Sequence, residues 1–249
     1  MGIARHGVED ILHLVKCHRD LMQGSILQLG RQDIYFDIDN LKQMSKMFGV
    51  ELMSSKINYV RNPHLTNPVI DDYTLFASLG FSSVDSMDCF DNEQPSIIHD
   101  LNHQIPPDLN LRFDVIYDGG TLEHVFDIAS AFRNIHSMVK PGGVVIHASP
   151  TNNLVDHGFW QLCPTAFVDT YSANNYTIIR CIISIIEDIS NINNVTPTRY
   201  KYDQAIFHSL SMGKFPAGIG STFFAARKPE HHMPFVTPVQ YPYKGLRSR

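Results

Sequence analysis

The most informative pattern of apolar and polar positions lies between Arg112 and Pro150. It starts with a short apolar run, Phe113 to Tyr117, rich in β-forming side chains, as expected of a parallel strand covered on both faces. A helix follows, and a second apolar run spans Val144 to Ala148. The order strand, helix, strand predicts a right-handed crossover between parallel strands. The helix is predicted from apolar side chains near helical spacing: Val125, Ile128, Ala129, Phe132, Ile135, Met138 and Val139.

Glycines mark the ends of these elements. Asp118-Gly119-Gly120 follows the first strand, and glycines at this place let a ligand approach the backbone closely. Lys140-Pro141-Gly142-Gly143 stops the helix before the second strand. The segment therefore reads as half of a ligand-binding α/β sheet.

Further elements are predicted on both sides of this unit. On its N-terminal side we expect helices over 8–22, 39–48 and 71–79 and strands over 25–30, 81–85 and 96–99. On its C-terminal side we expect a helix over 165–171 and strands over 176–186 and 222–226. The last two strands are expected to pair antiparallel, with residues 191–220 as their connection.

The chain is predicted to form one α/β domain over residues 1–227. Between Gly49 and Pro68 the pattern becomes irregular, and Asn62-Pro63 and Asn67-Pro68 break it, so we expect an insertion there. Residues 228–249 carry four prolines and little periodicity, which predicts a loose or partner-dependent C-terminal tail.

The segments FDVIYDGG, LEHV and VKPGG stand in an order and spacing that resemble the class I S-adenosylmethionine-dependent methyltransferases. The resemblance covers roughly Gly24 to Ala173. It implies a Rossmann-like, seven-stranded, mostly parallel sheet with helices on both faces, and S-adenosylmethionine as cofactor. The chain departs from the family at the glycine-rich loop after the first strand, where Gln28 replaces an acidic residue and only Gly30 remains of the glycines.

The amino-acid composition limits the classes of molecule that the protein is expected to bind. The 249 residues are 43% hydrophobic and 18% charged, and the net charge is −5 with a pI near 6.2. No broad attraction to nucleic acid or to anionic membranes follows, so a small-molecule substrate is favoured. Four scattered cysteines without a CxxC pair predict reduced thiols, and the absence of a signal-type core or membrane span predicts a cytoplasmic protein. Whether it forms a homo-oligomer stays open.

In sheets of this kind ligands bind at the loops that leave the carboxyl ends of the strands. In the first loop the resemblance implies that Gly30, Arg31 and Gln32 contact the cofactor; the alternative is a tight turn without a ligand role. After the second strand Asp85, next to Ser86, is expected to accept hydrogen bonds from ribose hydroxyls, or else to cap a helix.

The third and fourth loops complete the predicted cofactor site. By resemblance, the adenine lies at Asp100, Leu101 and Asn102, with Asp100 and Asn102 as competing partners of its amino group. Asp118, Gly119, Gly120 and His124 close the pocket. Glu123 and His124 are expected to begin the helix, where Glu123 also fits as an acid that complements the helix dipole; His124 fits equally well as a packing residue.

The fifth loop, Pro150 to Phe159, is the predicted substrate site. It contains Asp156 and His157, and an aspartate beside a histidine favours imidazole as a proton acceptor. We therefore assign His157 as the candidate base and Asp156 as the residue that orients it; a binding or surface role is the alternative. The spacing of the 13 histidines suggests no metal site.

Three functions are compatible with these residues. The first is transfer of a methyl group from S-adenosylmethionine to an oxygen or nitrogen of a small metabolite. The second is a non-catalytic binding or scaffold protein with the methyltransferase fold, which the altered glycine loop favours. A nicotinamide-dependent enzyme is disfavoured because Gly30-Arg31-Gln32-Asp33 is not G-x-G-x-x-G.

Overall fold

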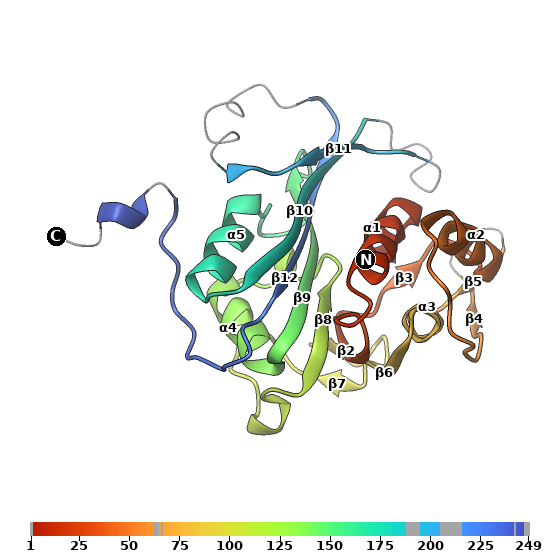
Figure 1. The fold of residues 1–249 in the computed structure, drawn as a ribbon, viewed down its shortest axis with the longest axis horizontal. Helices are drawn as coiled ribbons and strands as arrows, with labels where there is room; N and C mark the ends of the chain where they lie inside the picture. Colours follow the sequence, from red (N-terminus) through yellow and green to blue (C-terminus); the bar gives the residue numbers. More distant parts are fainter. Residues whose placement is uncertain are drawn as a thin grey trace.

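A single mixed sheet organises the protein. The computed structural model describes residues 2–61, 65, 67–187, 195–204, 216–241 and 243–246. Across these residues the sheet has eight strands, shown in Figure 1, in the order β11 (Thr198–Lys201), β10 (Thr177–Ile186), β12 (Ile219–Arg227), β9 (Val139–Asn152), β8 (Phe113–Asp118), β2 (Gly24–Leu29), β6 (Phe81–Asp88) and β7 (Ile97–Ile98). The strands from β9 to β7 are parallel, and β12 runs antiparallel between β9 and β10.

The α/β class and the mostly parallel sheet are thus confirmed, but the number of strands is eight instead of the seven predicted. The extra strand is β11, which pairs antiparallel with β10 inside the segment predicted to be only a connection. Arg199 of β11 reaches Glu9 of the first long helix, with 2.9 Å between Nη2 and the carboxylate. This ion pair helps to hold an edge strand that has a neighbour on one side only.

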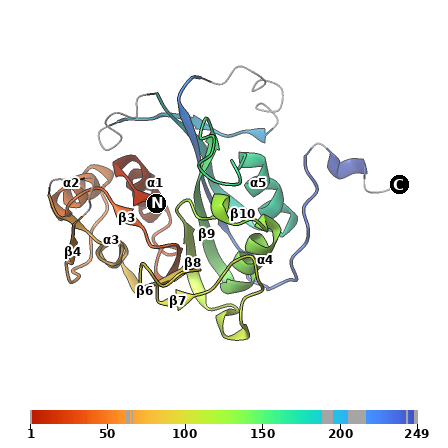
Figure 2. The ribbon, with the colours of Figure 1, turned by 180° about the vertical axis from the view of Figure 1, so that it is seen from behind.

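Helices cover both faces of the sheet, as predicted (Figures 1 and 2). One face carries α1 (Arg5–Cys17), α2 (Ile38–Phe48) and α3 (Asp72–Leu79), and the other carries α4 (Ile128–Met138) and α5 (Pro164–Ala173). Side chains of a strand alternate between the faces, so Val144 and Ile146 join the first core and Val145 joins the second. Burial on both faces explains why these strands read as continuous apolar runs.

Polar caps place the ends of several helices. The Asp37 side chain accepts a hydrogen bond from the Asn40 amide at the start of α2, and Asp71 does the same for Thr74 at the start of α3. Helix α1 covers residues 5–17 instead of the predicted 8–22. Helix α4 begins at Ile128, where Asp127 caps it. Glu123 and His124 therefore do not begin this helix, contrary to the prediction; they lie in a separate 3-10 turn, η2 (Leu122–His124).

Short elements complete the N-terminal half. Strand β1 (Gly2–Ile3) pairs in parallel with β3 (Asp33–Ile34), and β4 (Tyr59–Val60) pairs antiparallel with β5 (Val69–Ile70). Strand β4 lies inside the predicted insertion and β5 directly follows it, whereas Asn62 and Pro63 of the insertion lie outside the described residues. Two further 3-10 turns are η1 (Pro107–Leu109) and η3 (Tyr243–Leu246). No helix in the described part of the chain has both the length and the apolar character needed to cross a membrane.

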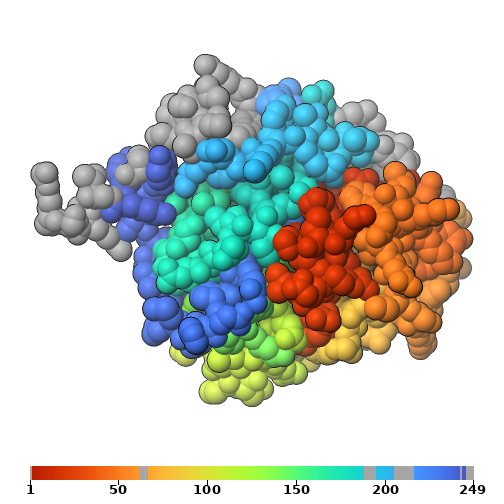
Figure 3. Space-filling model, viewed as in Figure 1, coloured from red at the N-terminus to blue at the C-terminus, as the bar shows by residue number. Residues whose placement is uncertain are grey.

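The C-terminal tail is docked along its described residues, contrary to the prediction of a loose segment. The Asn174 side chain donates to the Val236 carbonyl at 2.9 Å and accepts from the Val236 amide at 2.7 Å. The Tyr241 amide donates to Asp169 of α5 at 2.8 Å. Figure 3 shows the blue C-terminal segment against the teal surface of the segment that contains α5. Hydrogen bonding by main-chain groups explains how a segment without periodicity can still be ordered.

Candidate active site

A cavity of about 800 Å³ opens at the carboxyl edge of the parallel strands. Its sheet side is lined by Gly119, Gly120, Glu123, Ser149, Pro150 and His157, and its opposite side by residues of β1 and of the start of α1. Tyr117 and Leu65, the latter from the predicted insertion, also line it. This is the edge at which α/β sheets bind ligands, and the volume falls within the roughly 300–1,000 Å³ of small-molecule sites.

Asp118 does not face this cavity. Its side chain is fully buried, and one oxygen accepts hydrogen bonds from the amides of Thr121 and Leu122. The other lies 2.8 Å from Nδ1 of His147, whose Nε2 lies 2.7 Å from the Tyr171 hydroxyl. The assignment of Asp118 to cofactor binding is therefore corrected, because its carboxylate is occupied by a network inside the core.

Gly119 makes a close contact between two loops. A Cβ atom at Gly119 would collide with the Gln32 side chain, which is itself buried. The Nε2 of Gln32 donates to the Leu29 carbonyl at 3.2 Å, whereas its Oε1 has no hydrogen-bond partner among the described residues. The Gln32 side chain thus fills the space between the loops that follow β2 and β8.

The loop after β2 forms the predicted turn at Gly30, but the charge of Arg31 is engaged in an ion pair within the protein. Gly30 has a φ of 71°, the left-handed region that glycine adopts readily, and its amide donates to the Met87 carbonyl. Arg31 forms a bidentate ion pair with the buried Asp72 at the start of α3, at 2.7 and 2.8 Å. The prediction that the Arg31 side chain contacts the cofactor is corrected, because Asp72 holds its guanidinium.

The second strand is longer than predicted. Because β6 continues to Asp88, Asp85 lies within the strand and not in the loop beyond it. Its carboxylate accepts hydrogen bonds from Ser96 at 3.0 Å and from Ser83 at 3.2 Å, and the Ser86 backbone amide also donates to Ser96. The acid at the carboxyl end of the strand is Asp88, which the sequence analysis did not select.

The third predicted loop, which contains Asp100 and Asn102, is stabilised by hydrogen bonds of its own side chains. Asp100 accepts hydrogen bonds from the backbone and side-chain nitrogens of Asn102, and the backbone bond is the main cause that lowers the pKa of Asp100. The Asn102 oxygen accepts from the Asp127 amide at 2.8 Å, and Leu101 is buried. Asp100 remains partly exposed, so a ligand can still reach it.

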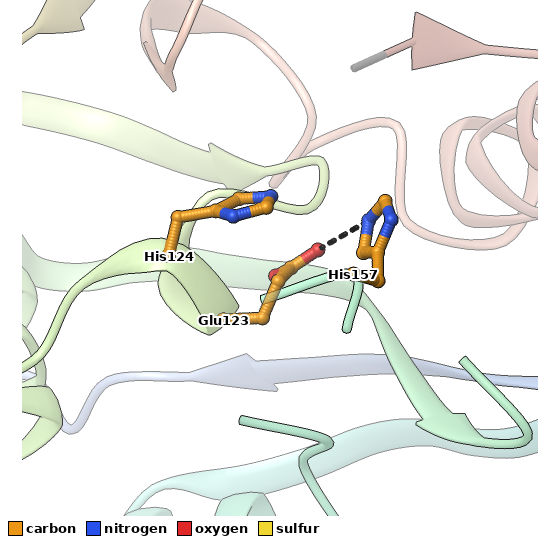
Figure 4. A group of neighbouring side chains, drawn as sticks. All are labelled: Glu123, His124 and His157. Atoms are coloured by element: carbon orange, nitrogen blue, oxygen red, sulfur yellow. Dashed lines mark ion pairs between the residues drawn. The ribbon is translucent and has the colours of Figure 1, made fainter. Parts of the chain in front are cut away.

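Glu123 and His157 line the cavity, and His124 lies beside them (Figure 4). Nε2 of His157 lies 3.7 Å from Oε1 of Glu123. The ring centroids of His124 and His157 are 5.2 Å apart. Glu123 is 1% exposed. Burial, followed by the charge of Asp118, raises the pKa of Glu123 to about 8. Burial, followed by repulsion from His157, lowers the pKa of His124.

The carboxylate beside His157 is thus that of Glu123 and not that of Asp156. Asp156 is exposed, has a positive φ of 63°, and makes no ion pair or hydrogen bond with His157 among the residues that the structure describes. The assignment of Asp156 as the orienting acid is corrected. His157 lies beside Glu123, which belongs to a different loop. The prediction chose Asp156 because it is adjacent in sequence.

Comparison with known proteins supplies the family. A family model described as a methyltransferase domain matches residues 37–241, and the chain therefore belongs to this family of methyltransferase domains. Membership implies the use of S-adenosylmethionine. No curated protein matches the sequence.

Solved structures with a similar fold include three methyltransferases of low sequence identity. A putative sarcosine dimethylglycine methyltransferase from Galdieria sulphuraria is 11% identical, with 90% of this chain and 85% of that chain covered and a TM-score of 0.46. An S-adenosylmethionine-dependent enzyme from Archaeoglobus fulgidus is 9% identical, with 88% and 94% covered and a TM-score of 0.41. One from Mesorhizobium loti is 14% identical, with 82% and 90% covered and a TM-score of 0.38.

The cavity leaves room for part of such a cofactor. The backbone at Gly119 and Gly120 lines it without side chains, so a ligand can approach the main chain there. The Gln32 side chain occupies the space that a glycine at this position would leave open. The fit therefore depends on the loops around Gly119 more than on the loop after β2.

Proposed function

We propose that the protein transfers the methyl group of S-adenosylmethionine to an oxygen or nitrogen atom of a small-molecule metabolite. The observation that carries the proposal is the cavity at the carboxyl edge of the sheet, where the Gly119-Gly120 backbone faces the His157 loop. Family membership supports the choice of cofactor. The net charge of −5 supports a small acceptor over a nucleic acid.

We assign the cofactor contacts to loops at the carboxyl edge of the sheet. The Gly30 carbonyl and the backbone of Gly119 and Gly120 offer contacts, and Asp88 replaces Asp85 as the acid for the ribose hydroxyls because it ends β6. The Asp100–Asn102 loop is the proposed adenine contact. When bound, the cofactor supplies an electrophilic methyl group on a sulfonium.

The remaining task of the protein is to align the acceptor in a cavity that excludes water. His157 lines this cavity, is partly exposed and lies beside Glu123, so it can take a proton from an acceptor hydroxyl or ammonium. Glu123 is the proposed positioning residue for the imidazole. Tyr117 and Leu65 form parts of the surrounding wall.

Calorimetric titration with S-adenosylhomocysteine tests the proposal directly. We expect one binding site per chain in the wild type and in a His157→Ala variant, because the imidazole is proposed to act on the acceptor and not on the cofactor. Methyl transfer to an accepted substrate should fall by about 10²–10⁴-fold in His157→Ala, as for loss of a general base. Absence of binding to the folded wild type would refute the methyltransferase proposal.

A second candidate function, a non-catalytic binding or scaffold protein, is favoured by the buried Gln32 side chain between the two loops. A Gln32→Gly variant distinguishes the two. If Gln32 blocks the cofactor, the variant should bind S-adenosylhomocysteine where the wild type does not. If the wild type binds, the same change should alter the affinity without creating it.

A further inference from the structure

Three metal-ligating side chains from two separate loops converge beside the cavity. Glu123 and His124 come from η2, and His157 comes from the loop that follows β9 (Figure 4). One ligand atom from each of the three can be chosen so that all lie within 4.8 Å of one another. The cluster lies beside the space assigned above to the acceptor, since Glu123 and His157 both line the cavity.

Glu123 has no close partner among the described residues: the basic group beside it is His157, with 3.7 Å between Oε1 and Nε2. The Glu123 side chain is 1% exposed, and both carboxylate oxygens lack a hydrogen-bond partner among the described residues. A buried carboxylate without a hydrogen-bond partner is destabilising. A cation at this point would compensate it.

The two histidines favour a metal ion over a sulfonium. An imidazole nitrogen binds a metal through its lone pair, whereas a sulfonium offers neither an N–H donor nor an open coordination position to that lone pair. The distance of 3.7 Å between Glu123 Oε1 and His157 Nε2 is too long for a hydrogen bond. It is close to the roughly 3.3 Å that separates two ligands placed about 2.0–2.1 Å from one tetrahedral ion.

The surrounding backbone holds the two loops in this arrangement. The Trp160 amide donates to the Glu123 carbonyl at 3.1 Å, and the Trp160 indole donates to the Val125 carbonyl at 2.9 Å. Gly158 follows His157 directly, and a Cβ atom there would lie 2.7 Å from the Glu123 carbonyl oxygen. Because position 158 is a glycine, the His157 loop can approach the Glu123 backbone this closely.

We propose that Glu123, His124 and His157 bind one divalent cation of the first transition series, with a remaining coordination position open to the cavity. Two imidazoles and one carboxylate are a ligand set that Zn²⁺ and its neighbours accept, and three protein ligands leave room for a further one. An acceptor hydroxyl in the cavity would be oriented by this ion.

This site stands independently of the proposed methyl transfer, since it rests on the cluster alone. When the cation is bound, His157 serves as a ligand, and its role as a base is restricted to the metal-free protein. A protein that binds Zn²⁺ but not S-adenosylhomocysteine would refute only the methyltransferase proposal. A protein that binds the nucleoside but not Zn²⁺ would refute only the metal site.

Titration of the tag-free protein with Zn²⁺, and with Co²⁺ followed by its visible absorption, tests the site. The wild type should bind one equivalent of either ion. Glu123→Gln keeps the shape of the side chain and removes the charge, and His124→Ala removes an exposed ring without disturbing the core. Each variant should bind at least about tenfold more weakly, because even changes beyond the direct ligands cost about 10–100-fold.

Asp156→Asn is the matched control, since Asp156 precedes His157 in the chain but lies outside the cluster. This variant should keep the wild-type affinity for Zn²⁺ and the wild-type Co²⁺ spectrum. Equal Zn²⁺ binding by the wild type, Glu123→Gln and His124→Ala would place the ion elsewhere and overturn the proposal. Absence of Zn²⁺ binding by the folded wild type would overturn it as well.

Discussion

At the scale of single residues, Asp118 joins the ends of neighbouring elements. Its carboxylate links β8 to β9 through His147 and, through the Tyr171 hydroxyl, to α5. The same carboxylate caps the turn at Thr121 that leads to η2. This buried network fixes the loop that carries Gly119 and Gly120, although Asp118 itself is closed to ligands.

We expect an Asp118→Ala variant to lose about 3–5 kcal/mol of unfolding free energy, because it leaves buried partners without their acceptor. Urea denaturation measures the loss. Asp85→Ala, which removes a more exposed carboxylate, should lose less than about half as much. Similar losses in both variants would show that the network adds no more than a surface contact does.

Glu123 should make stability depend on pH. Its pKa in the folded protein is raised to about 8, mainly by burial, so the folded state holds the proton more tightly than the unfolded state. The wild type is therefore expected to be favoured below the unfolded pKa and to lose stability relative to Glu123→Gln as pH rises from about 4.5 to about 8. The slope cannot exceed about 1.4 kcal/mol per pH unit.

Urea unfolding of the two proteins between pH 5 and pH 9, with a chelator present, measures this difference. Above the folded pKa the difference should level off. A difference that does not vary over this range would mean that Glu123 has the same proton affinity in the folded and unfolded chains. Zn²⁺ should remove the pH-dependent loss in the wild type, because it stabilises the ionised carboxylate.

At the scale of elements, the spacing of apolar residues along the sequence identified the central strands and most helices. Strands β8 and β10 and helices α2 and α3 lie within one or two residues of the predicted ranges, because burial on fixed faces leaves a regular pattern. The eighth strand, β11, was missed, since TRYK is short and partly exposed and depends on pairing with β10. The turn η2 was missed because Asp127, a capping residue, was not recognised as the start of α4.

The docked tail depends on one side-chain amide. Asn174 is 4% exposed and bonds the Val236 backbone in both directions as well as the Thr170 carbonyl. An Asn174→Ala variant should lose about 2–3 kcal/mol, because three hydrogen bonds are removed and main-chain groups are left unpaired. Residues 228–241 should also become sensitive to protease.

Limited proteolysis and hydrogen exchange of the tail amides check this expectation. Asn92→Ala serves as the control, since Asn92 is exposed and lies far along the chain from the tail. Unchanged protection of the Val236 amide in Asn174→Ala would show that other contacts are sufficient to hold the tail. The prolines of the tail disfavour helix and strand, so the sequence has no periodic pattern there from which docking could be predicted.

At the scale of the whole molecule, the sequence predicted that several of the loops after the strands meet at one edge of the sheet, but not which side chains contact one another there. Gly119, Gly120 and His157 line one cavity, as the loop positions suggested. Glu123 was interpreted as a helix-start acid because its partner His157 lies in a different loop, and no local pattern reports such a contact. Arg31 and Asp118 appeared free to bind a ligand because their buried partners Asp72 and His147 are also distant in sequence.

Binding of the cofactor should stabilise the molecule as a unit, since the proposed contacts come from β2, β6 and β8. At a concentration 100-fold above its dissociation constant, S-adenosylhomocysteine should add about 2.7 kcal/mol and raise Tm by roughly 5–10 °C. Thermal melts measure the shift. NAD at the same concentration should leave Tm unchanged, and the opposite pattern would favour the nicotinamide-dependent alternative.

The contact between Gln32 and Gly119 has a consequence for how this sequence can diverge. Because a Cβ atom at Gly119 would overlap the Gln32 side chain, the two positions share one limited volume. Related proteins with alanine or a larger residue at the position of Gly119 should carry a shorter residue at that of Gln32. Substitutions at these two sites are then expected to appear together in descent, with Gln32 shortened before Gly119 is enlarged.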